Sequence, residues 1–467
     1  MKCIIELSNK YSIIKNLHKA QVIIDLDLLC SYLVKGFQFT TAYQKGNWDG
    51  RNRLFDKRNN IVPTGMLSII VKYFDDNNID YEIKDIRKKP KKMFSIQNNN
   101  FILRDYQKQA VEKALEVERG RIVIATGGGK TLVALEILRQ LGVKSLFVVN
   151  TKEALYDTYN MAVSFFGDEN VKNGNISNYS KTRKVGDFLT LTTMAQIVAN
   201  YKKANKDLSN VEAIVIDECH HSGATSWYES IMLSNSYYRF GLTATNFRTD
   251  GGSKLLLATT GKTIVNINAN TLQKLGYLVK ADINIYELNE PKELDTPLKY
   301  HEIYDKGIVY NDTRNNVIVD IVKRNLGKSI LVVVEKIEHG IVLENLIKQI
   351  TDCVYINGNS KNREEIKKKF ADGDIKVVIA TRIYNESVDI PILEVVINAS
   401  GGMSGIKVLQ RIGRALRLNV NKQKSQIWDF LDNFNVKLQT HSYQRIKYMK
   451  KEKHSIKFVS KIGSRSI

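Results

Sequence analysis

RIVIATGGGKTLVALEILRQL, residues 121–141, holds the pattern from which the rest of the fold can be worked out. It opens with a short β-branched run, continues through three glycines and a Lys-Thr pair, and ends in apolar residues at helical spacing. A strand, a glycine-rich loop and a helix in this order are typical of a phosphate cradle, because glycines let backbone N–H groups approach the oxygens closely. Ile124 stands where the strict motif has its first glycine, so the loop matches that motif only in part.

The residues of this loop have expected roles in holding ATP. Lys130 is expected to reach the β- and γ-phosphates, and the hydroxyl of Thr131 is expected to hold Mg²⁺. The backbone of the loop is expected to surround the phosphates. The loop residues assigned to ATP binding are Thr126, Gly127, Gly128, Gly129, Lys130 and Thr131.

Short apolar runs continue beyond this loop and begin again after residues 291–297. Runs of this kind, separated by helical patterns, indicate a parallel sheet that is covered on both faces. The sequence therefore predicts an α/β chain with two tandem, doubly wound parallel-sheet domains. The expected strands are 121–125, 145–150, 188–193 and 213–218 in the first domain, and 330–334, 353–357, 376–381 and 394–399 in the second.

The residues before the loop predict a smaller α+β domain followed by a linker. Residues 3–7 and 21–27 resemble strands, and residues 66–74 resemble a helix. Residues 84–93 are strongly charged and include Pro90, which predicts a solvated linker. A chain of 467 residues fits roughly three domains. Their expected bounds are 1–92, 98–290 and 297–467.

The segment KGNWDGRNRLF, residues 45–55, contains an Asp-Gly pair between apolar flanks. This pair predicts a tight β-hairpin turn. Trp48 and Phe55 are then expected to fill a small core, with a base-stacking wedge as the alternative role for Trp48. Arg51 and Arg53 are candidates for contacts with a phosphate backbone.

The composition favours a polyanionic partner. The net charge is +21. Lys and Arg that neutralise phosphates release condensed counterions, which favours binding to a polyanion. Such a charge can also serve solubility alone. The four cysteines lie far apart, which argues against a disulfide framework, and the adjacent Cys219, His220 and His221 are not expected to bind a metal. No run approaches eighteen apolar residues, so a cytoplasmic protein without membrane contact is expected.

Two charged pairs could supply the chemistry of ATP hydrolysis. Asp217 and Glu218 follow an apolar run, so Asp217 is expected to hold Mg²⁺ and Glu218 to deprotonate the attacking water. Arg414 and Arg417 are three residues apart, share one helix face, and suit stabilisation of charge on the γ-phosphate. Taken singly, each of these residues could instead be a solvated charge. If Arg417 acts in this way, hydrolysis requires the two sheet domains to close.

Taken together, these segments resemble a superfamily 2 helicase of the DExH group, with two RecA-like domains. The resemblance implies an ATP-driven motor that moves along nucleic acid. Ala125 stands where the family commonly has proline, and Ser387 stands where it commonly has glycine. The matching segments are LRDYQ (103–107), ATGGGKT (125–131), DECH (217–220), LTAT (242–245), ATRIYNESVDIP (380–391) and QRIGRALR (410–417).

The resemblance adds further site residues. It implies that Gln107 hydrogen-bonds the adenine edge and that Asp389 contributes to nucleotide binding. It also implies that Gln410 acts with the two arginines of its segment in catalysis. The residues placed at the nucleic-acid backbone are Thr151, Thr193 and Thr381, although hydroxyls at strand ends are also routine helix caps.

A narrower resemblance links the chain to the UvsW-type branch-migration helicases of phages. It rests on YQKGNWDGRNRLFD (43–56) and QIWDFLDN (426–433). It implies an ATP-dependent enzyme that unwinds or remodels forks, Holliday-type junctions and R-loops in the host cytoplasm during phage replication, recombination and repair. The sequence does not determine the oligomeric state, and a monomer is favoured. A DExH RNA helicase or ribonucleoprotein remodeller would share the motor motifs. A nucleic-acid-binding module with a silent ATPase site is a second alternative.

Overall fold

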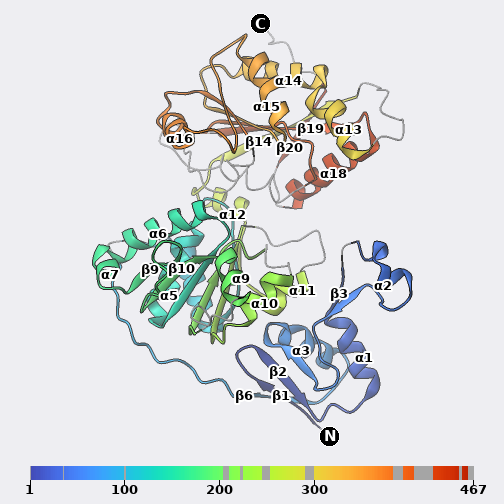
Figure 1. Ribbon diagram of the computed structural model, residues 1–467, viewed down its shortest axis with the longest axis vertical. Helices are drawn as coiled ribbons and strands as arrows, with labels where there is room; N and C mark the ends of the chain where they lie inside the picture. Colours follow the sequence, from blue (N-terminus) through green and yellow to red (C-terminus); the bar gives the residue numbers. More distant parts are fainter. Residues whose placement is uncertain are drawn as a thin grey trace. The chain divides into compact units, whose positions relative to one another are not determined.

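The structure is a computed structural model that divides into two compact units (Figure 1). One unit comprises residues 1–124 and 129–266, and the other comprises residues 125–128 and 267–467. None of the described helices combines the length and the apolar character that crossing a membrane requires. The described residues are 2–34, 36–98, 101–202, 210–220, 225–244, 253–289, 299–381, 393–403, 424–451 and 455–460.

Residues up to Asp85 form a small α+β domain. Its four-stranded sheet has the order β5-β2-β1-β6, with β1 antiparallel to β2 and parallel to β6. The predicted strand at 21–27 is wrong, because these residues lie in α1, where Val22 and Leu26 are one helical turn apart and both buried. The elements are β1 (Cys3–Leu7), β2 (Tyr11–Lys15), α1 (Ala20–Leu29), β3 (Ser31–Leu33), η1 (Phe37–Phe39), α2 (Thr41–Gln44), β4 (Arg51–Arg53), β5 (Ile61–Pro63), η2 (Thr64–Met66), α3 (Leu67–Asp76) and β6 (Tyr81–Asp85).

The backbone around Asp49 and Gly50 does not form the predicted tight hairpin. β4 follows this pair, but its partner is β3, with Leu33 opposite Arg51. Because η1 and α2 lie between the two strands, the connection is a long one. Gly50 has a φ of +79°, and a Cβ there would lie 2.3 Å from the ring of Phe37, so both the backbone and the space require glycine.

A seven-stranded sheet forms the centre of the first RecA-like domain, in the order β13-β7-β12-β11-β8-β10-β9. The neighbours from β7 to β9 run parallel, and the four strands predicted here are all present. Helices flank both faces of the sheet (Figure 1). The elements are α4 (Asp105–Val117), β7 (Arg119–Ile124), α5 (Lys130–Leu141), β8 (Ser145–Val149), α6 (Lys152–Phe166), α7 (Asp168–Lys172), β9 (Ile176–Asn178), α8 (Tyr179–Thr182), β10 (Leu189–Thr193), α9 (Met194–Lys202), β11 (Ala213–Ile216), α10 (Thr225–Met232), β12 (Tyr238–Thr243), α11 (Ser253–Thr260) and β13 (Thr263–Ile267).

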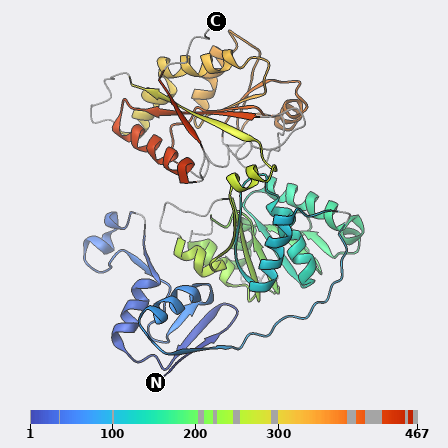
Figure 2. The ribbon, with the colours of Figure 1, turned by 180° about the vertical axis from the view of Figure 1, so that it is seen from behind.

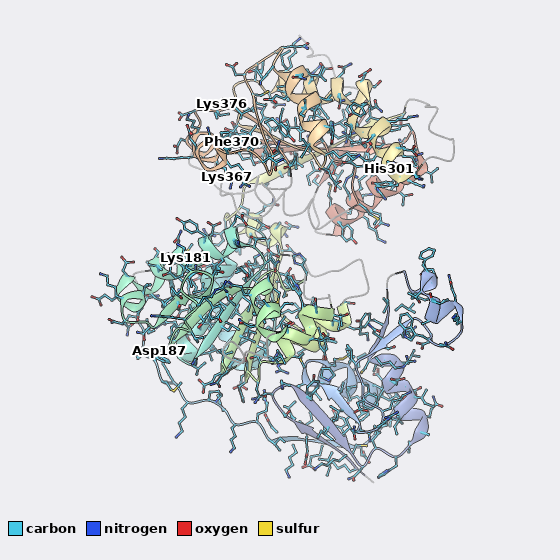
Figure 3. All side chains as sticks on the ribbon, in the orientation of Figure 1. Lys181, Asp187, His301, Lys367, Phe370 and Lys376 are labelled. Atoms are coloured by element: carbon cyan, nitrogen blue, oxygen red, sulfur yellow. The ribbon has the colours of Figure 1, made fainter. Side chains whose placement is uncertain are left out.

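The second RecA-like domain has its own seven-stranded parallel sheet, in the order β16-β17-β15-β18-β19-β14-β20. Figure 2 shows this domain from behind, with helices beside its strands. The four strands predicted here are also present, so the predicted fold class is confirmed. Phe370, which is fully buried on α16, anchors that helix (Figure 3). The elements are α12 (Ala269–Lys274), β14 (Lys280–Leu288), α13 (Tyr300–Tyr304), η4 (Asp305–Val309), α14 (Asp312–Arg324), β15 (Ile330–Val333), α15 (Ile337–Ile347), β16 (Val354–Ile356), α16 (Arg363–Asp372), β17 (Val377–Ala380), β18 (Val395–Asn398), β19 (Lys424–Asp432), α18 (Val436–Lys451) and β20 (Ile456–Val459).

β14 belongs to the second sheet. All nine of its residues are in parallel register with β19, from Lys280 opposite Lys424 to Leu288 opposite Asp432. The expected end of the first sheet domain at residue 290 lies beyond this strand. The two sheets therefore divide the chain before β14, earlier than the change in sequence composition at 291–297.

The N-terminal domain packs against α11 of the first RecA-like domain. Ala258 on α11 belongs to the hydrophobic core of the N-terminal domain. A Cβ on Gly65 would lie 2.2 Å from the carbonyl oxygen of Leu257, so only glycine allows this approach. The Nζ of Lys254 also donates a hydrogen bond to the carbonyl oxygen of Leu29 at 2.6 Å.

Candidate nucleotide-binding and catalytic site

The phosphate loop connects the carboxyl end of β7 to the first residue of α5. Gly127 and Gly129 have φ values of +84° and +76°, a left-handed conformation that other residues seldom adopt. The backbone N–H of Gly128 donates to the carbonyl oxygen of Ala125 at 2.9 Å, which closes the loop on itself. Lys130 and Thr131 then form the first turn of α5, where the helix presents its free N–H groups.

Gln107 lies directly beside this loop. It is 3% exposed, and its Oε1 accepts a hydrogen bond from the backbone N–H of Arg104 at 2.9 Å. Its Nε2 faces Gly129, because a Cβ at that residue would lie only 2.5 Å from it. The structure therefore places an amide group next to the phosphate loop, on the helix that LRDYQ begins.

Two carboxylates reach the site from the end of β11. Asp217 donates its backbone N–H to the carbonyl oxygen of Val148 at 2.8 Å, and its Oδ1 accepts the N–H of Glu218 at 2.9 Å. The Oε1 of Glu218 lies 2.8 Å from the Nζ of Lys130. Motif residues that are far apart in sequence thus meet, because β7 and β11 end at the same edge of a parallel sheet.

The protonation of these groups follows from burial and from their mutual charges. Burial raises the pKa of Asp217 to about 6, and the neighbouring charge of Glu218 adds to this effect. Burial also opposes ionisation of Glu218, but the charge of Lys130 and a hydrogen bond from His220 outweigh it and hold the pKa of Glu218 below normal. Glu218 is therefore ionised at neutral pH, as a group that accepts a proton must be.

The donor set at this site fits Mg²⁺. Hydroxyl and carboxylate oxygens are the ligands that Mg²⁺ prefers, and it usually takes only one or two of them from the protein. Burial and the neighbouring charge of Glu218 raise the pKa of Asp217 despite the opposing charge of Lys130, and a divalent cation would favour its ionised form. Among the described residues, no group of three or more His, Cys, Asp or Glu side chains could hold a metal by itself.

His220 is a site residue that the sequence argument missed. Its Nδ1 lies 3.1 Å from the Oε2 of Glu218 and 3.1 Å from the Oγ1 of Thr243. It therefore connects the DECH segment to the LTAT segment at the end of β12. The adjacent Cys219 is fully buried, and burial raises the pKa of its thiol to about 12, so it behaves as a core residue. The histidine of DECH was the available signal, but it was considered only as a metal ligand.

The three threonines expected at the nucleic-acid backbone lie at strand ends, as predicted from their sequence positions. The Oγ1 of Thr151 accepts the N–H of Ala154 at 3.1 Å and caps α6. Thr193 and Thr381 are 5% and 8% exposed. A structural role is thus visible for Thr151, and the contacts of all three with nucleic acid remain predictions.

The N-terminal arginines differ in how much of each side chain is already engaged. Arg53 binds Asp49 through two hydrogen bonds of 3.0 and 2.6 Å and binds Asp27 through a third of 2.8 Å. This pairing lowers the pKa of Asp49 to about 2. Within the described part of the chain, the one hydrogen bond of the Arg51 guanidinium is a long one, of 3.3 Å, to the Oγ of Ser31. Arg51 is therefore the more available of the two for a phosphate.

Trp48 does not fill the core. Phe55 belongs to the core cluster of the N-terminal domain as predicted, whereas Trp48 is half-buried and lies outside that cluster. The indole N–H of Trp48 donates to the carbonyl oxygen of Arg51 at 2.8 Å. The ring therefore holds the backbone at the start of β4.

The remaining predicted site residues, Asp389, Gln410, Arg414 and Arg417, lie outside the described residues.

Comparisons with known proteins account for nearly the whole chain. The family model described as DNA helicase UvsW, N-terminal, matches residues 5–85. The model for the res subunit of type III restriction enzymes matches residues 100–248, and the helicase conserved C-terminal domain matches residues 313–419. The ATP-dependent DNA helicase uvsW of Enterobacteria phage T4 is 27% identical over 443 residues, which cover 87% of this chain and 86% of that protein. Together these matches support a superfamily 2 helicase of the UvsW type.

Two further proteins are similar to this chain. The DNA 3'-5' translocase XPB2 of Sulfurisphaera tokodaii is 26% identical over 395 residues, covering 74% of this chain and 85% of that protein. The DNA-bound type ISP restriction-modification enzyme LlaBIII has a TM-score of 0.57 and 16% identity, over 78% of this chain and 32% of that one. The structural likeness shows the shared fold. Together with the family matches, these similarities support an ATP-dependent DNA helicase.

Proposed function

We propose that this helicase unwinds or branch-migrates branched DNA, namely forks, Holliday-type junctions and R-loops, in phage replication, recombination and repair. The observation that carries the proposal is the UvsW N-terminal match at residues 5–85, because the motor motifs alone occur in DNA and RNA helicases alike. The high positive charge suits a phosphate backbone, and Lys181 and Lys376 are exposed examples of it (Figure 3).

The proposed ATP cycle assigns a role to each loop residue. Gln107 contacts adenine, and the backbone of residues 126–129 surrounds the phosphates. Lys130 leaves Glu218 when it binds the β- and γ-phosphates, which frees the Glu218 carboxylate to accept a proton from the attacking water. Thr131 and Asp217 would hold Mg²⁺, whose charge would stabilise the negative charge of the phosphates. Asp389 is proposed to contribute to nucleotide binding, and Gln410 to catalysis.

Arg414 and Arg417 are proposed to stabilise the charge that develops on the γ-phosphate. An arginine supplied in this way is worth about 10³- to 10⁵-fold in turnover in other NTPases. Thr151, Thr193 and Thr381 are proposed to hold the nucleic-acid backbone without reading sequence. Arg51 contacts a phosphate of the branched substrate, and Arg53 does so after release from Asp49.

Three further assignments are proposed from the sequence. The domains cover residues 1–92, 98–290 and 297–467, with β14 assigned to the second RecA-like sheet despite its place before residue 290. The helicase acts as a monomer, and it works in the cytoplasm of the bacterial host.

Strand displacement on matched substrates tests the proposal. A four-way junction, a fork and a linear duplex with a single-stranded tail are built from the same sequences, and unwinding is measured at equal ATP. We expect faster displacement on the two branched substrates and none with Lys130→Ala. Equal rates on all three DNAs, or faster displacement from structured RNA, would count against the branched-DNA assignment and favour a general or RNA-directed helicase.

A further inference from the structure

The helix α18 in the second RecA-like domain carries charge of one sign only. Its 16 residues, 436–451, include four lysines and one arginine, and their sequence has no aspartate or glutamate. On α16, by contrast, Lys369 pairs at 2.8 Å with Glu365, which lies one helical turn before it. The lysines of α18 therefore have no acidic residue on their own helix to neutralise them.

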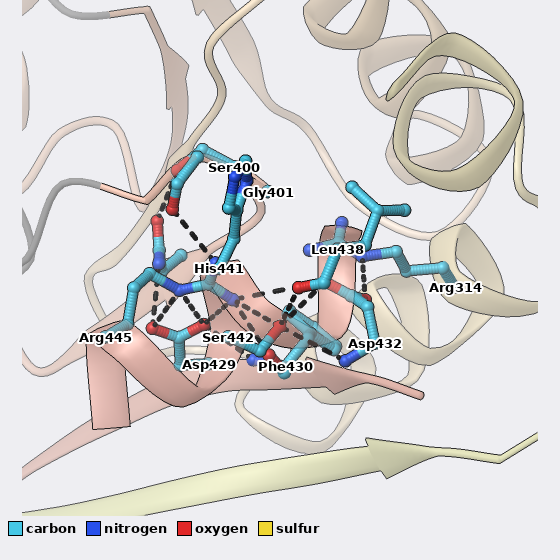
Figure 4. Close-up of polar contacts among 12 residues, drawn as sticks. Arg314, Ser400, Gly401, Asp429, Phe430, Asp432, Leu438, His441, Ser442 and Arg445 are labelled. Atoms are coloured by element: carbon cyan, nitrogen blue, oxygen red, sulfur yellow. Dashed lines mark hydrogen bonds and ion pairs between the residues drawn. The ribbon is translucent and has the colours of Figure 1, made fainter. Parts of the chain in front are cut away.

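One face of α18 is fixed to β19 by buried polar groups (Figure 4). The guanidinium of Arg445 contacts both oxygens of Asp429, at 2.9 to 3.2 Å, and its Nη2 donates to the carbonyl oxygen of Phe430 at 2.8 Å. The Oγ of Ser442 accepts the backbone N–H of Asp432 at 3.3 Å. Arg445 and Asp429 are each 1% exposed. Rotation of the helix about its own axis would break these contacts, so the direction of its outer face is fixed.

The outer face of α18 is a stripe of exposed residues that recur every four and three positions. This spacing places them on one side of the helix. In the part of the chain that the structure describes, no carboxylate lies within ion-pair distance of the two lysines of the stripe. The stripe thus presents two unneutralised cations and the hydroxyl of a tyrosine that is 52% exposed. Its members are Val436, Thr440, Tyr443, Lys447 and Lys450.

The chemistry of this face suits a polyanion that runs along the helix. Lys447 and Lys450 lie one turn apart, so their like charges repel each other until an anion neutralises them. A membrane surface does not fit, because a helix binds it through an accessible apolar face and the apolar Leu438 and Met449 of α18 are fully buried. A row of phosphates supplies negative charge and hydrogen-bond acceptors without requiring apolar contact.

The length of the charged part of the stripe matches a short piece of DNA backbone. Tyr443 and Lys450 are seven residues apart, which is about 10 Å along the helix at a rise of about 1.5 Å per residue. One strand of duplex DNA places about three phosphates in that length, at about 3.4 Å of axial rise each. The three side chains therefore have spacing for about one phosphate each.

We propose that Tyr443, Lys447 and Lys450 form a binding surface for the sugar-phosphate backbone of DNA. The two ammonium groups neutralise phosphates, and the hydroxyl of Tyr443 donates a hydrogen bond to a neighbouring phosphate. Contacts of this kind hold a strand without reading its sequence. The inference rests on the DNA substrate of the helicase, and it does not depend on the branched shape that is proposed for that substrate.

The salt dependence of binding to a linear duplex tests the proposal in the full chain. The double variant Lys447→Gln with Lys450→Gln removes two phosphate contacts, so we expect the slope of log affinity against log salt to fall by about 1.8. The control, Lys361→Gln with Lys368→Gln, removes equal charge from two exposed lysines of the same domain and is expected to leave the slope within error. Unchanged slope in the first variant, or an equal fall in the control, would show that this surface does not bind DNA.

Photocrosslinking locates the contact independently of charge. Tyr443→p-benzoylphenylalanine is compared with Tyr310→p-benzoylphenylalanine, because Tyr310 lies in the same domain and is similarly exposed, at 57%. We expect DNA crosslinks from position 443 and only background from position 310. Equal yields from the two positions, or crosslinks from position 443 to a second copy of the chain in place of DNA, would overturn the proposal.

The linear duplex keeps this test separate from that of the proposed function. If the slope falls as expected but the wild-type helicase unwinds linear and branched DNA equally well, the branched-DNA assignment fails and the surface on α18 stands. If branched DNA is preferred and the slope is unchanged, the surface on α18 is wrong and the proposed function stands.

Discussion

Gly129 offers a direct test of how the phosphate loop is built. Replacing it with alanine introduces two separate costs. The φ of +76° is a left-handed backbone conformation, which costs roughly 1–2 kcal/mol for a residue that has a β-carbon. The new Cβ would also lie 2.5 Å from the Nε2 of Gln107, which must then move.

Gln107 can move only by giving up its contact with the backbone N–H of Arg104, because the side chain is buried and its Oε1 is engaged there. A hydrogen bond of this kind is worth about 1 kcal/mol. The two costs together come to about 2–3 kcal/mol, or a factor of roughly 30 to 150. The free loop can relax away from the strain, but binding ATP must restore the loop, so the cost is expected as weaker ATP binding.

Titration of Gly129→Ala with a fluorescent ATP analogue measures this loss, with Gln107→Ala as the reference for lost adenine contact. In the Gln107→Ala background the steric cost disappears, so Gly129→Ala is expected to weaken binding only about 5- to 30-fold further. Wild-type affinity in the Gly129→Ala variant would refute the reasoning. An equal loss in both backgrounds would show that Gln107 does not lie against the loop.

Three other predictions concern catalysis, acid stability and DNA contact. Glu218→Gln is expected to lower kcat by about 10²- to 10⁴-fold while ATP still binds. Stopped-flow kinetics measure the loss of hydrolysis, and filter binding measures the retained affinity for ATP. Burial and the charge of Arg314 lower the pKa of His339 to about 3 in the folded chain. Between pH 6.5 and 3 the histidine therefore binds a proton in the unfolded chain but stays neutral in the folded chain. The free energy of unfolding is thus highest above pH 6.5 and decreases as the pH falls below it. Denaturant unfolding at pH 5 against pH 7.5 should show about 2 kcal/mol of this loss, absent in His339→Gln. Arg51→Gln should reduce the slope of log affinity for junction DNA against log salt by about 0.9, whereas Lys72→Gln on α3 should leave the slope within error.

The two sheets could be predicted from sequence because each buried strand is a short β-branched run with polar or glycine-rich ends. The phosphate loop and the Asp217–Glu218 pair were found for the same reason, since parallel strands bring their carboxyl ends together at one edge. The change in composition at 291–297 leaves β14 before the expected boundary although it pairs with β19 of the second sheet, because membership in a sheet is set by pairing partners far along the chain.

The N-terminal domain was harder to predict for a physical reason. The run QVIIDLD alternates well enough to resemble a strand, yet Val22 and Leu26 are the side chains that reach the core, at helical spacing. Asp49-Gly50 is a local hairpin signal, but the partner of β4 is β3, beyond η1 and α2. The contact of His220 with Thr243 joins the ends of two strands that become neighbours only when the sheet folds, so the sequence alone does not reveal it.

If the N-terminal domain directs a general motor to branched DNA, the stimulation of ATP hydrolysis by different nucleic acids shows it most directly. The turnover of ATP is measured with single-stranded, duplex, forked and four-way DNA and with structured RNA, all at equal nucleotide concentration. We predict the highest turnover with forked and four-way DNA, and a selective loss of that preference in Arg51→Gln. Highest turnover with RNA, or equal turnover on linear and branched DNA, would contradict the account.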